Sequence, residues 1–270
     1  MDESKLENQK LLDNNRKYEL IEKIIFEGVN EITKISEFSL ANKCLLINLI
    51  VSGYIKTENV LYSMLITDKY NFVNEEYIEG NDIFGQLNHI YSDSPLQMGY
   101  NVNISAPHMH AFALENLAPF CTEGAKILDI GSGSGYLTVA LSKMINDTGL
   151  VVGVEHIPDL YQFSINNVGK NYPDLLNNKI IFVNQDGRKG FAPYGPYKVI
   201  HVGAASEQLP QELINQLDRN GRMFIPIGPE GGEQIIYLID KDHNGNITSI
   251  PILSVAYSML QDIESQLANN

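Results

Sequence analysis

The chain has 270 residues, with 33 acidic side chains against 19 basic ones and a formal net charge of −14. Hydrophobic residues make up 44% and charged residues 19%, which is typical of a globular protein of one large or two small domains and excludes a disordered or fibrous chain. The acidic excess disfavours a general nucleic-acid binder, because phosphate backbones are held by clustered Lys and Arg side chains.

The two cysteines, Cys44 and Cys121, lie far apart and outside any CxxC pattern, which disfavours a disulfide framework and a cysteine zinc site. The residues after Met1 include neither the basic region nor the apolar region of a secretory signal. The longest apolar run, Cys44 to Val51, is too short to span a bilayer. We therefore expect a cytoplasmic protein with no metal site and no membrane partner.

The N-terminal part differs from the rest of the chain. Apolar residues at helical spacing predict one amphipathic helix within Leu6 to Asn30. We interpret residues 1–40 as a helical extension that packs on the main domain or docks a partner, including a second copy of the chain. The main domain is expected over residues 41–270. Oligomeric state does not follow from the sequence.

Two more helices are predicted next, one from Ser39 to Ser52 that ends at Gly53, and one that begins after Thr57 as its N-cap. From Asp68 to Asp93 the irregular pattern predicts a long loop with short elements, of the kind that is functional or inserted.

From about residue 108 apolar strands alternate with amphipathic helices, and Asn244-Gly245 marks a hairpin between the last two strands. This alternation predicts an α/β fold with a doubly wound, mostly parallel sheet, helices on both faces and antiparallel C-terminal strands. Its ligand is expected at the carboxyl ends of the strands, near the turn after the first strand. The predicted strands are Lys126–Ile130, Leu150–Val154, Ile180–Val183, Tyr197–Val202, Arg222–Ile227, Gln234–Ile239 and Ile247–Ser254, and the predicted helices are Tyr136–Ile145, Pro158–Asn171 and Pro210–Leu217.

A glycine-rich turn follows the first of these strands. Residues 128–136 read Leu-Asp-Ile-Gly-Ser-Gly-Ser-Gly-Tyr, so the third glycine comes one residue earlier than in a dinucleotide-binding G-x-G-x-x-G turn. Asp129 stands two positions before the first glycine. This combination resembles motif I of S-adenosylmethionine (SAM) methyltransferases, and it favours SAM over NAD. A glycine turn alone also occurs at strand–helix junctions that only need close packing.

Two acidic residues extend the pattern. Glu155 ends the second strand about 20 residues after the turn, where a carboxylate accepts both ribose hydroxyls of an adenosine; the alternative is an exposed Glu at the start of a loop. Asp186 follows the third strand in Gln185-Asp-Gly-Arg188 and could accept the adenine amino group, although an Asp-Gly pair alone indicates a turn.

The sequence contains the six segments Tyr91-Ser-Asp-Ser-Pro-Leu-Gln-Met-Gly99, Ile104-Ser-Ala-Pro-His-Met-His110, Ile127-Leu-Asp-Ile-Gly-Ser-Gly-Ser-Gly135, Asp186-Gly-Arg188, Ile200-His-Val-Gly-Ala-Ala205 and Pro226-Ile-Gly-Pro-Glu-Gly-Gly-Glu-Gln234. Together they resemble the protein-L-isoaspartate (D-aspartate) O-methyltransferase family. The resemblance runs from about Cys44 to the C-terminus. It implies methyl transfer from SAM, with S-adenosylhomocysteine as product, to the free carboxylate of L-isoaspartyl residues in damaged proteins and peptides. The ester then closes to a succinimide, which reopens partly to normal aspartate.

By this resemblance Ser105 is the active-site serine. A carboxylate is ionised at pH 7 and needs no general base, so we assign the hydroxyl to orienting the acceptor. The alternative is that Ser105 caps the helix that starts near Pro107. His110 is a cofactor contact or a structural histidine. The resemblance places the cofactor on Val102, Asn103, Ile104, Ser105, His110, Asp129, Gly131, Ser132, Gly133, Gly135, Glu155, Asp186, Gly187, Gln261 and Gln266.

The chain also departs from the family pattern. Asn103 replaces the usual Thr, Glu233 replaces the usual Asn, and Tyr257-Ser-Met-Leu-Gln-Asp262 replaces Tyr-Val-Pro-Leu-Thr-Asp. The N-terminal extension and an insertion at about 74–90 are foreign to the family core. These departures bear on peptide specificity and oligomeric state more than on the reaction. The rival interpretations are a SAM methyltransferase with another acceptor, a degenerate SAM-binding module that acts through its N-terminal helix, and an NAD oxidoreductase.

Overall fold

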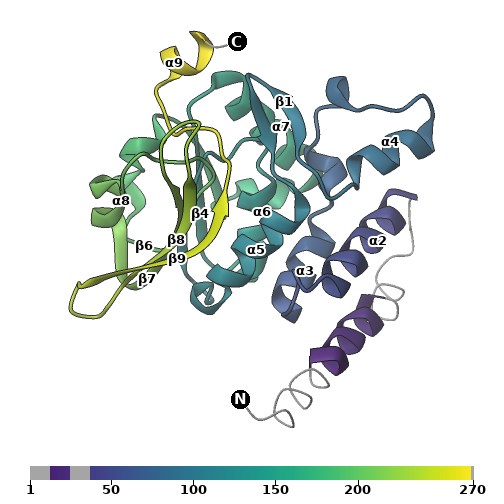
Figure 1. Cartoon of the computed structure of the whole chain (residues 1–270), viewed down its shortest axis with the longest axis horizontal. Coiled ribbons are helices and arrows are strands. Elements are labelled where there is room, and N and C mark those ends of the chain that lie inside the picture. Colours follow the sequence, from purple (N-terminus) through teal and green to yellow (C-terminus); the bar gives the residue numbers. More distant parts are fainter. Residues whose placement is uncertain (1–12, 25–36, 269–270) are drawn as a thin grey trace.

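The computed structural model describes residues 13–24 and 37–268 (Figure 1). Residues 13–24 form a helix, which confirms part of the predicted N-terminal helix; the rest of that prediction lies outside the described residues. Helix α2 (Glu37–Val51) ends before Gly53, whose φ of +80° is the left-handed conformation expected of a helix-ending glycine. Within the described ranges, no helix combines the length and apolarity that a bilayer span requires.

Seven strands form the central sheet in the order β5-β4-β3-β6-β7-β8-β9. The first five are parallel, and β8 and β9 are antiparallel, as the sequence predicts. The strands are β3 (Lys126–Ile130), β4 (Leu150–Glu155), β5 (Ile180–Asn184), β6 (Tyr197–Val202), β7 (Leu217–Ile227), β8 (Gln234–Lys241) and β9 (Ile247–Val255).

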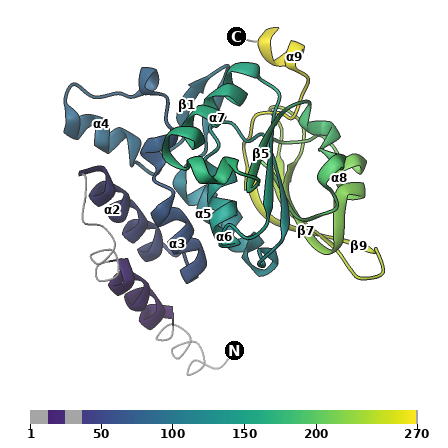
Figure 2. The same cartoon turned by 180° about the vertical axis from the view of Figure 1, so that it is seen from behind.

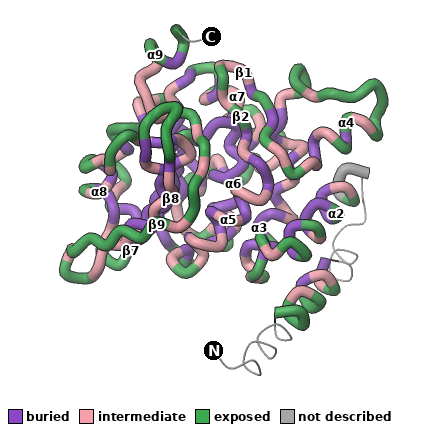
Figure 3. Tube along the Cα trace, viewed as in Figure 1, coloured by how far each residue is buried: buried purple, intermediate pink, exposed green. Residues whose placement is uncertain are grey.

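Helices cover both faces of this sheet (Figures 1 and 2). One face packs against α5 (Pro107–Leu117), α6 (Tyr136–Met144) and α7 (Pro158–Asn171), and the other packs against α8 (Gln211–Gln216). Neighbouring strand residues alternate between the two cores: Ile127 faces the larger helical side and Leu128 the α8 side. The tube coloured by burial shows α6 largely buried and the β8–β9 hairpin tip exposed (Figure 3).

Two predicted boundaries near residue 217 need correction. Strand β7 starts at Leu217 rather than Arg222, because Leu217 already pairs with Tyr197 across an irregular register, and helix α8 therefore ends one residue earlier. The region from Asp68 to Asp93 contains α4 (Ile83–Ile90) and two short 3-10 helices, which agrees with the expected loop with short elements.

A small antiparallel hairpin was absent from the sequence prediction. Strands β1 (Leu96–Gly99) and β2 (Val102–Ile104) pair around Tyr100 and Asn101, which both adopt left-handed backbone conformations, with φ of +57° and +53°. Two consecutive residues with positive φ are typical of a tight hairpin turn. The hairpin leads directly into Ser105 and α5.

Thr57 caps helix α3 (Glu58–Ile66), as predicted: its hydroxyl accepts a hydrogen bond from the Val60 amide at 3.4 Å and donates one to Glu115 Oε1 at 3.1 Å. Thr57→Ala removes both contacts, so we expect it to lower the free energy of unfolding by about 1–2 kcal/mol in urea denaturation. Thr122→Ala, at an exposed position, is the matched control. An unchanged unfolding midpoint in Thr57→Ala would contradict this role.

Candidate active site

A cavity of about 300 Å³ lies at the carboxyl ends of β3, β4 and β6, where the sequence places the ligand. This volume is at the lower end of the range for small-molecule sites. An inner pocket of about 50 Å³ shares a wall with it. The shared wall consists of Met98, Asn103, Ser105, Met109, Gly131, Gly133, Gly203 and Tyr257.

The glycine turn after β3 forms one side of the cavity. Gly131, Gly133 and Gly135 all have positive φ, at +76°, +52° and +86°. A Cβ built on Gly133 would lie 3.0 Å from Met98 Cε, so a larger residue at this position would crowd Met98 and reduce the space in the cavity. Ser132 lines the inner pocket, and its buried hydroxyl has no hydrogen-bond partner among the described residues. A buried polar atom without a partner fits a site that a polar ligand completes.

Glu155 ends β4 and is 6% exposed, so the alternative of an exposed loop residue is wrong. Its Oε2 accepts a hydrogen bond from the Gly133 amide at 3.0 Å, and its Oε1 accepts one from the Ile157 amide at 2.9 Å. Burial raises the pKa of the carboxyl, and the two backbone amides oppose that shift. The carboxylate therefore fixes the glycine turn and keeps further acceptor capacity toward the cavity that it lines.

Asp129 is 1% exposed and lies in the wall of the inner pocket. Thr138 Oγ1 donates to its Oδ2 at 2.6 Å, and a hydrogen bond of 2.8 Å joins His201 Nδ1 to its Oδ1. No local sequence pattern points to a role for His201. It reaches Asp129 because β3 and β6 pair in parallel with these two residues side by side.

Ser105 lies between β2 and α5 and lines both the cavity and the inner pocket. The N-cap of α5 is Ala106, and no side-chain hydrogen bond caps this helix, so the alternative capping role of Ser105 is wrong. The Ser105 side chain instead lies near the Tyr257 hydroxyl, where it opposes the rise in the pKa of that group that burial causes. This places the predicted active-site serine at the junction of the two spaces.

The other residues of this segment divide between the two spaces. Val102 lines the main cavity, Ile104 lines the inner pocket, and Asn103 lines both. His110 reaches only the inner pocket, where its ring stacks on Tyr136 with a centroid distance of 4.6 Å. Burial, with positive charge nearby, lowers the pKa of His110 to about 3, so its imidazole is neutral at pH 7.

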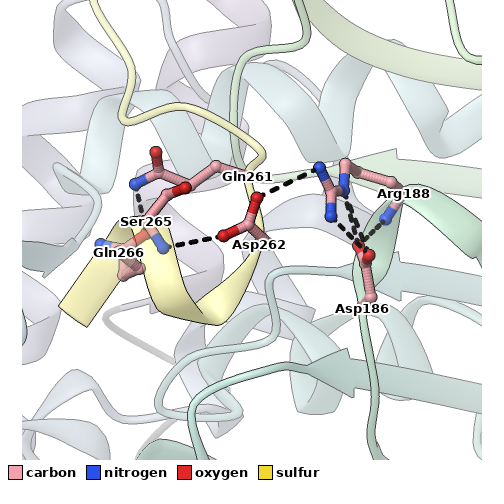
Figure 4. A network of polar contacts seen from close by, with 6 residues as sticks. All are labelled: Asp186, Arg188, Gln261, Asp262, Ser265 and Gln266. Carbon is pink, nitrogen blue, oxygen red and sulfur yellow. Dashed lines mark hydrogen bonds and ion pairs between the residues drawn. The ribbon is translucent and has the colours of Figure 1, made fainter. Parts of the chain in front are cut away.

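Asp186 forms an ion pair with Arg188, two residues along the chain. Its carboxylate pairs with the Arg188 guanidinium, with an Oδ2–Nη2 distance of 2.8 Å, and this contact lowers the pKa of Asp186 (Figure 4). Gly187 lines the cavity, whereas Asp186 does not. The adenine contact of Asp186 therefore stays a prediction.

Residues 256–266, here called the C-terminal strap, cross one side of the cavity. Gln261 and Gln266 both line it, and Gln261 Nε2 donates to Gln266 Oε1 at 3.0 Å (Figure 4). Gln266 Nε2 donates to the Tyr100 carbonyl at 3.0 Å, which joins the strap to the β1–β2 turn. Asp262 pairs with Arg188 at 3.7 Å. The structure thus brings all predicted cofactor residues to the two spaces except Gly135 and Asp186.

The arrangement suits transfer between two bound molecules. The glycine turn, Glu155 and the strap provide polar groups for a cofactor. The hydroxyls of Ser105 and Tyr257 belong to the shared wall. None of the described residues that line the cavity or the inner pocket is Lys or Arg. A negatively charged acceptor would therefore be held by hydrogen bonds rather than by a fixed basic side chain.

Comparison with known proteins identifies close relatives. A family model described as protein-L-isoaspartate(D-aspartate) O-methyltransferase matches residues 40–265. Protein-L-isoaspartate O-methyltransferase of Caenorhabditis elegans is 45% identical over 181 residues, which cover 67% of this chain and 80% of that relative. Protein-L-isoaspartate O-methyltransferase 1 of Arabidopsis thaliana is 37% identical over 228 residues, which cover 84% of this chain and 94% of that relative.

A solved structure has the same fold. A Plasmodium falciparum chain described as a protein-L-isoaspartate O-methyltransferase, in complex with S-adenosyl-L-homocysteine, matches with a TM-score of 0.71 and 32% sequence identity. The match covers 82% of this chain and 98% of that one.

Proposed function

Because the chain belongs to the protein-L-isoaspartate (D-aspartate) O-methyltransferase family, we infer that it transfers a methyl group from SAM to the free carboxylate of L-isoaspartyl residues in damaged proteins and peptides. The methyl ester closes to a succinimide, and this step begins the repair. The observation that best supports this function is the position of Ser105 on the wall between the cavity and the inner pocket.

The residues present fit the cofactor. The glycine turn, the unpartnered Ser132 hydroxyl and the buried Glu155 carboxylate offer hydrogen-bonding groups along one side of the cavity. We assign the ribose hydroxyls to Glu155, and the amino-acid portion to the turn beside Asp129. When bound there, SAM supplies an electrophilic methyl group on a positively charged sulfur.

The reaction needs no proton transfer. The acceptor carboxylate is ionised at pH 7, so one of its oxygens forms the O–C bond while the C–S bond breaks. Catalysis is then mostly a matter of position and of water exclusion. Ser105 donates a hydrogen bond to the acceptor carboxylate and orients it, and the strap and the β1–β2 hairpin enclose the reacting groups.

The net charge of −14 cannot attract a carboxylate substrate over long distances. Since no Lys or Arg lines the described cavity, recognition depends on local hydrogen bonds and on the positive charge of the bound cofactor. The same charge disfavours nucleic acid as the methyl acceptor. Both cysteines, Cys44 and Cys121, are free thiols, which supports a reducing compartment such as the cytoplasm.

We propose that the N-terminal extension stabilises the main domain and lies apart from the active site. Leu20 and Ile24 of helix 13–24 are buried in the main core, and this helix lies at the opposite end of the molecule from α9 (Ile263–Ala268) in both views (Figures 1 and 2). Its Lys17 Nζ donates to the Val51 carbonyl at 3.0 Å. Tyr18 faces outward and is available for self-association.

Leu20→Ala is therefore expected to lower the free energy of unfolding by about 2–4 kcal/mol, since it deletes a buried side chain, and to leave kcat/KM within about twofold at 25 °C. Denaturant titration and a methylation assay measure the two quantities. Tyr18→Ala, on the exposed face of the same helix, is the control for stability. A large loss of kcat/KM in folded Leu20→Ala would show that the extension takes part in catalysis.

Repair of a synthetic isoaspartyl peptide tests the function. With SAM present, chromatography should show the isoaspartyl peptide converting through a succinimide to the normal aspartyl form. The peptide should stay unchanged without SAM. If the peptide remains isoaspartyl while another added acceptor is methylated, the rival methyltransferase interpretation is correct.

A further inference from the structure

Tyr257 stands beside Ser105 in the wall shared by the cavity and the inner pocket. It belongs to the C-terminal strap, 152 positions along the chain from Ser105, and both residues line the cavity and the inner pocket. Burial raises the pKa of the Tyr257 hydroxyl to about 12, so this group is protonated at pH 7 and is able to donate a hydrogen bond.

The backbone of Tyr257 is held from two sides by one buried side chain. Gln234, at the start of β8, is 3% exposed. Its Nε2 donates to the Tyr257 carbonyl at 3.2 Å, and its Oε1 accepts from the Tyr257 amide at 2.6 Å. The side-chain amide therefore pairs with the tyrosine backbone as a neighbouring strand would.

The next residues of the strap are also fixed. The Ala205 amide donates to the Ser258 carbonyl at 2.8 Å, and the Leu260 amide donates to the Ala205 carbonyl at 2.7 Å. These contacts hold the strap to the loop that follows β6. The position of the Tyr257 ring is thus determined by backbone contacts that do not involve its hydroxyl.

Two adjacent hydroxyls can bind one carboxylate oxygen together. Each hydroxyl carries one proton that it can donate to a ligand. An acceptor carboxylate placed against the shared wall offers lone pairs to both protons. Because both donors lie on one side, they hold one oxygen and leave the second oxygen unbound by either.

We propose that Tyr257 is a second substrate-binding residue, which donates its hydroxyl hydrogen bond to the isoaspartyl carboxylate together with Ser105, and that Gln234 is the positioning residue that holds Tyr257 in place. The proposal rests on the proposed function and names the donors that orient its acceptor. The oxygen held by the two hydroxyls stays in place while the other attacks the methyl carbon.

Tyr257→Phe tests the donor role, because it removes the hydroxyl and keeps the ring. We expect kcat/KM for an isoaspartyl peptide to fall about tenfold, with the dissociation constant for S-adenosylhomocysteine unchanged within twofold. The loss should persist, at about fivefold or more, in a Ser105→Ala background, where a tyrosine that only oriented Ser105 would have no further effect. Tyr237→Phe, on β8 outside the cavity lining, is the matched control.

Three results would overturn the donor role: an unchanged kcat/KM in Tyr257→Phe, a loss that disappears in the Ser105→Ala background, or an equal loss of S-adenosylhomocysteine affinity. Failure of the proposed function is seen separately, since the unaltered protein would then not methylate the isoaspartyl peptide.

Gln234→Met tests the positioning role, since it keeps the length of the side chain and removes both hydrogen bonds to Tyr257. We expect kcat/KM to fall at least fivefold, mainly through a higher KM for the peptide, and to fall less than twofold when the substitution is added to Tyr257→Phe. A full loss in the Tyr257→Phe background would show that Gln234 acts through another group, and would refute its role as the positioning residue.

Discussion

Replacing Glu155 by Gln is expected to weaken SAM binding by about 100-fold or more. Each of its two oxygens accepts a hydrogen bond from a backbone amide, at Gly133 and at Ile157. An amide side chain has one acceptor oxygen, so its NH₂ group would face a second N–H donor and leave it unpaired. The glycine turn loses support, and the ribose loses a charged acceptor. Two hydrogen bonds from the ribose hydroxyls to a charged carboxylate would together be worth about 3–6 kcal/mol.

Isothermal titration of SAM and of S-adenosylhomocysteine measures this change directly. Glu207→Gln, at an exposed position outside the cavity lining, makes the same change of charge and is the control. Circular dichroism verifies that Glu155→Gln is folded. A folded variant that binds SAM within threefold of the unaltered protein would refute the assignment of the ribose to Glu155.

Ser105→Ala is expected to lower kcat/KM for an isoaspartyl peptide by about 30- to 100-fold while the affinity for S-adenosylhomocysteine stays within twofold. The substitution removes a donor to a charged acceptor, and such a bond contributes about 1.5–3 kcal/mol. It should also leave the stability nearly unchanged, because the hydroxyl does not cap helix α5. Steady-state kinetics with varied peptide and saturating SAM measure the effect.

Ser249→Ala on the exposed strand β9 is the control for this comparison. If Ser105→Ala retained full activity, the hydroxyl would have no part in orienting the acceptor. If it lost cofactor affinity in the same proportion as kcat/KM, its role would lie in SAM binding instead.

The sequence predicts the parallel core of the sheet well because each strand there is a short apolar run bounded by turn residues. The predicted bounds of β3, Lys126–Ile130, match the structure at both ends. The start of β7 was wrong because Asp218 to Gly221 has the composition of a turn, although Leu217 before it already pairs with Tyr197 of β6. The β1–β2 hairpin was missed because Tyr100 and Asn101 lack the glycine that usually marks such a turn.

The site residues also divide into those that local sequence patterns predict and those that depend on tertiary contacts. Glu155 and the glycine turn were predictable because the ends of adjacent parallel strands meet at one sheet edge. The pair of His201 and Asp129 depends on the register of β3 against β6, which no local pattern specifies. Tyr257 and Gln234 depend on how the strap folds back over the sheet, in a segment that departs from the family pattern. Asp186 pairs with Arg188 two residues away, and a motif shared with relatives does not reveal that local competition.

The most direct test of the account compares two peptides that differ only in one linkage. Both are incubated with methyl-labelled SAM, one with an L-isoaspartyl residue and the other with a normal aspartyl residue at the same position. We expect label in the isoaspartyl peptide alone, as a base-labile ester on its free carboxylate. Label in both peptides, or in neither, would contradict the assignment of this cavity to isoaspartyl methylation.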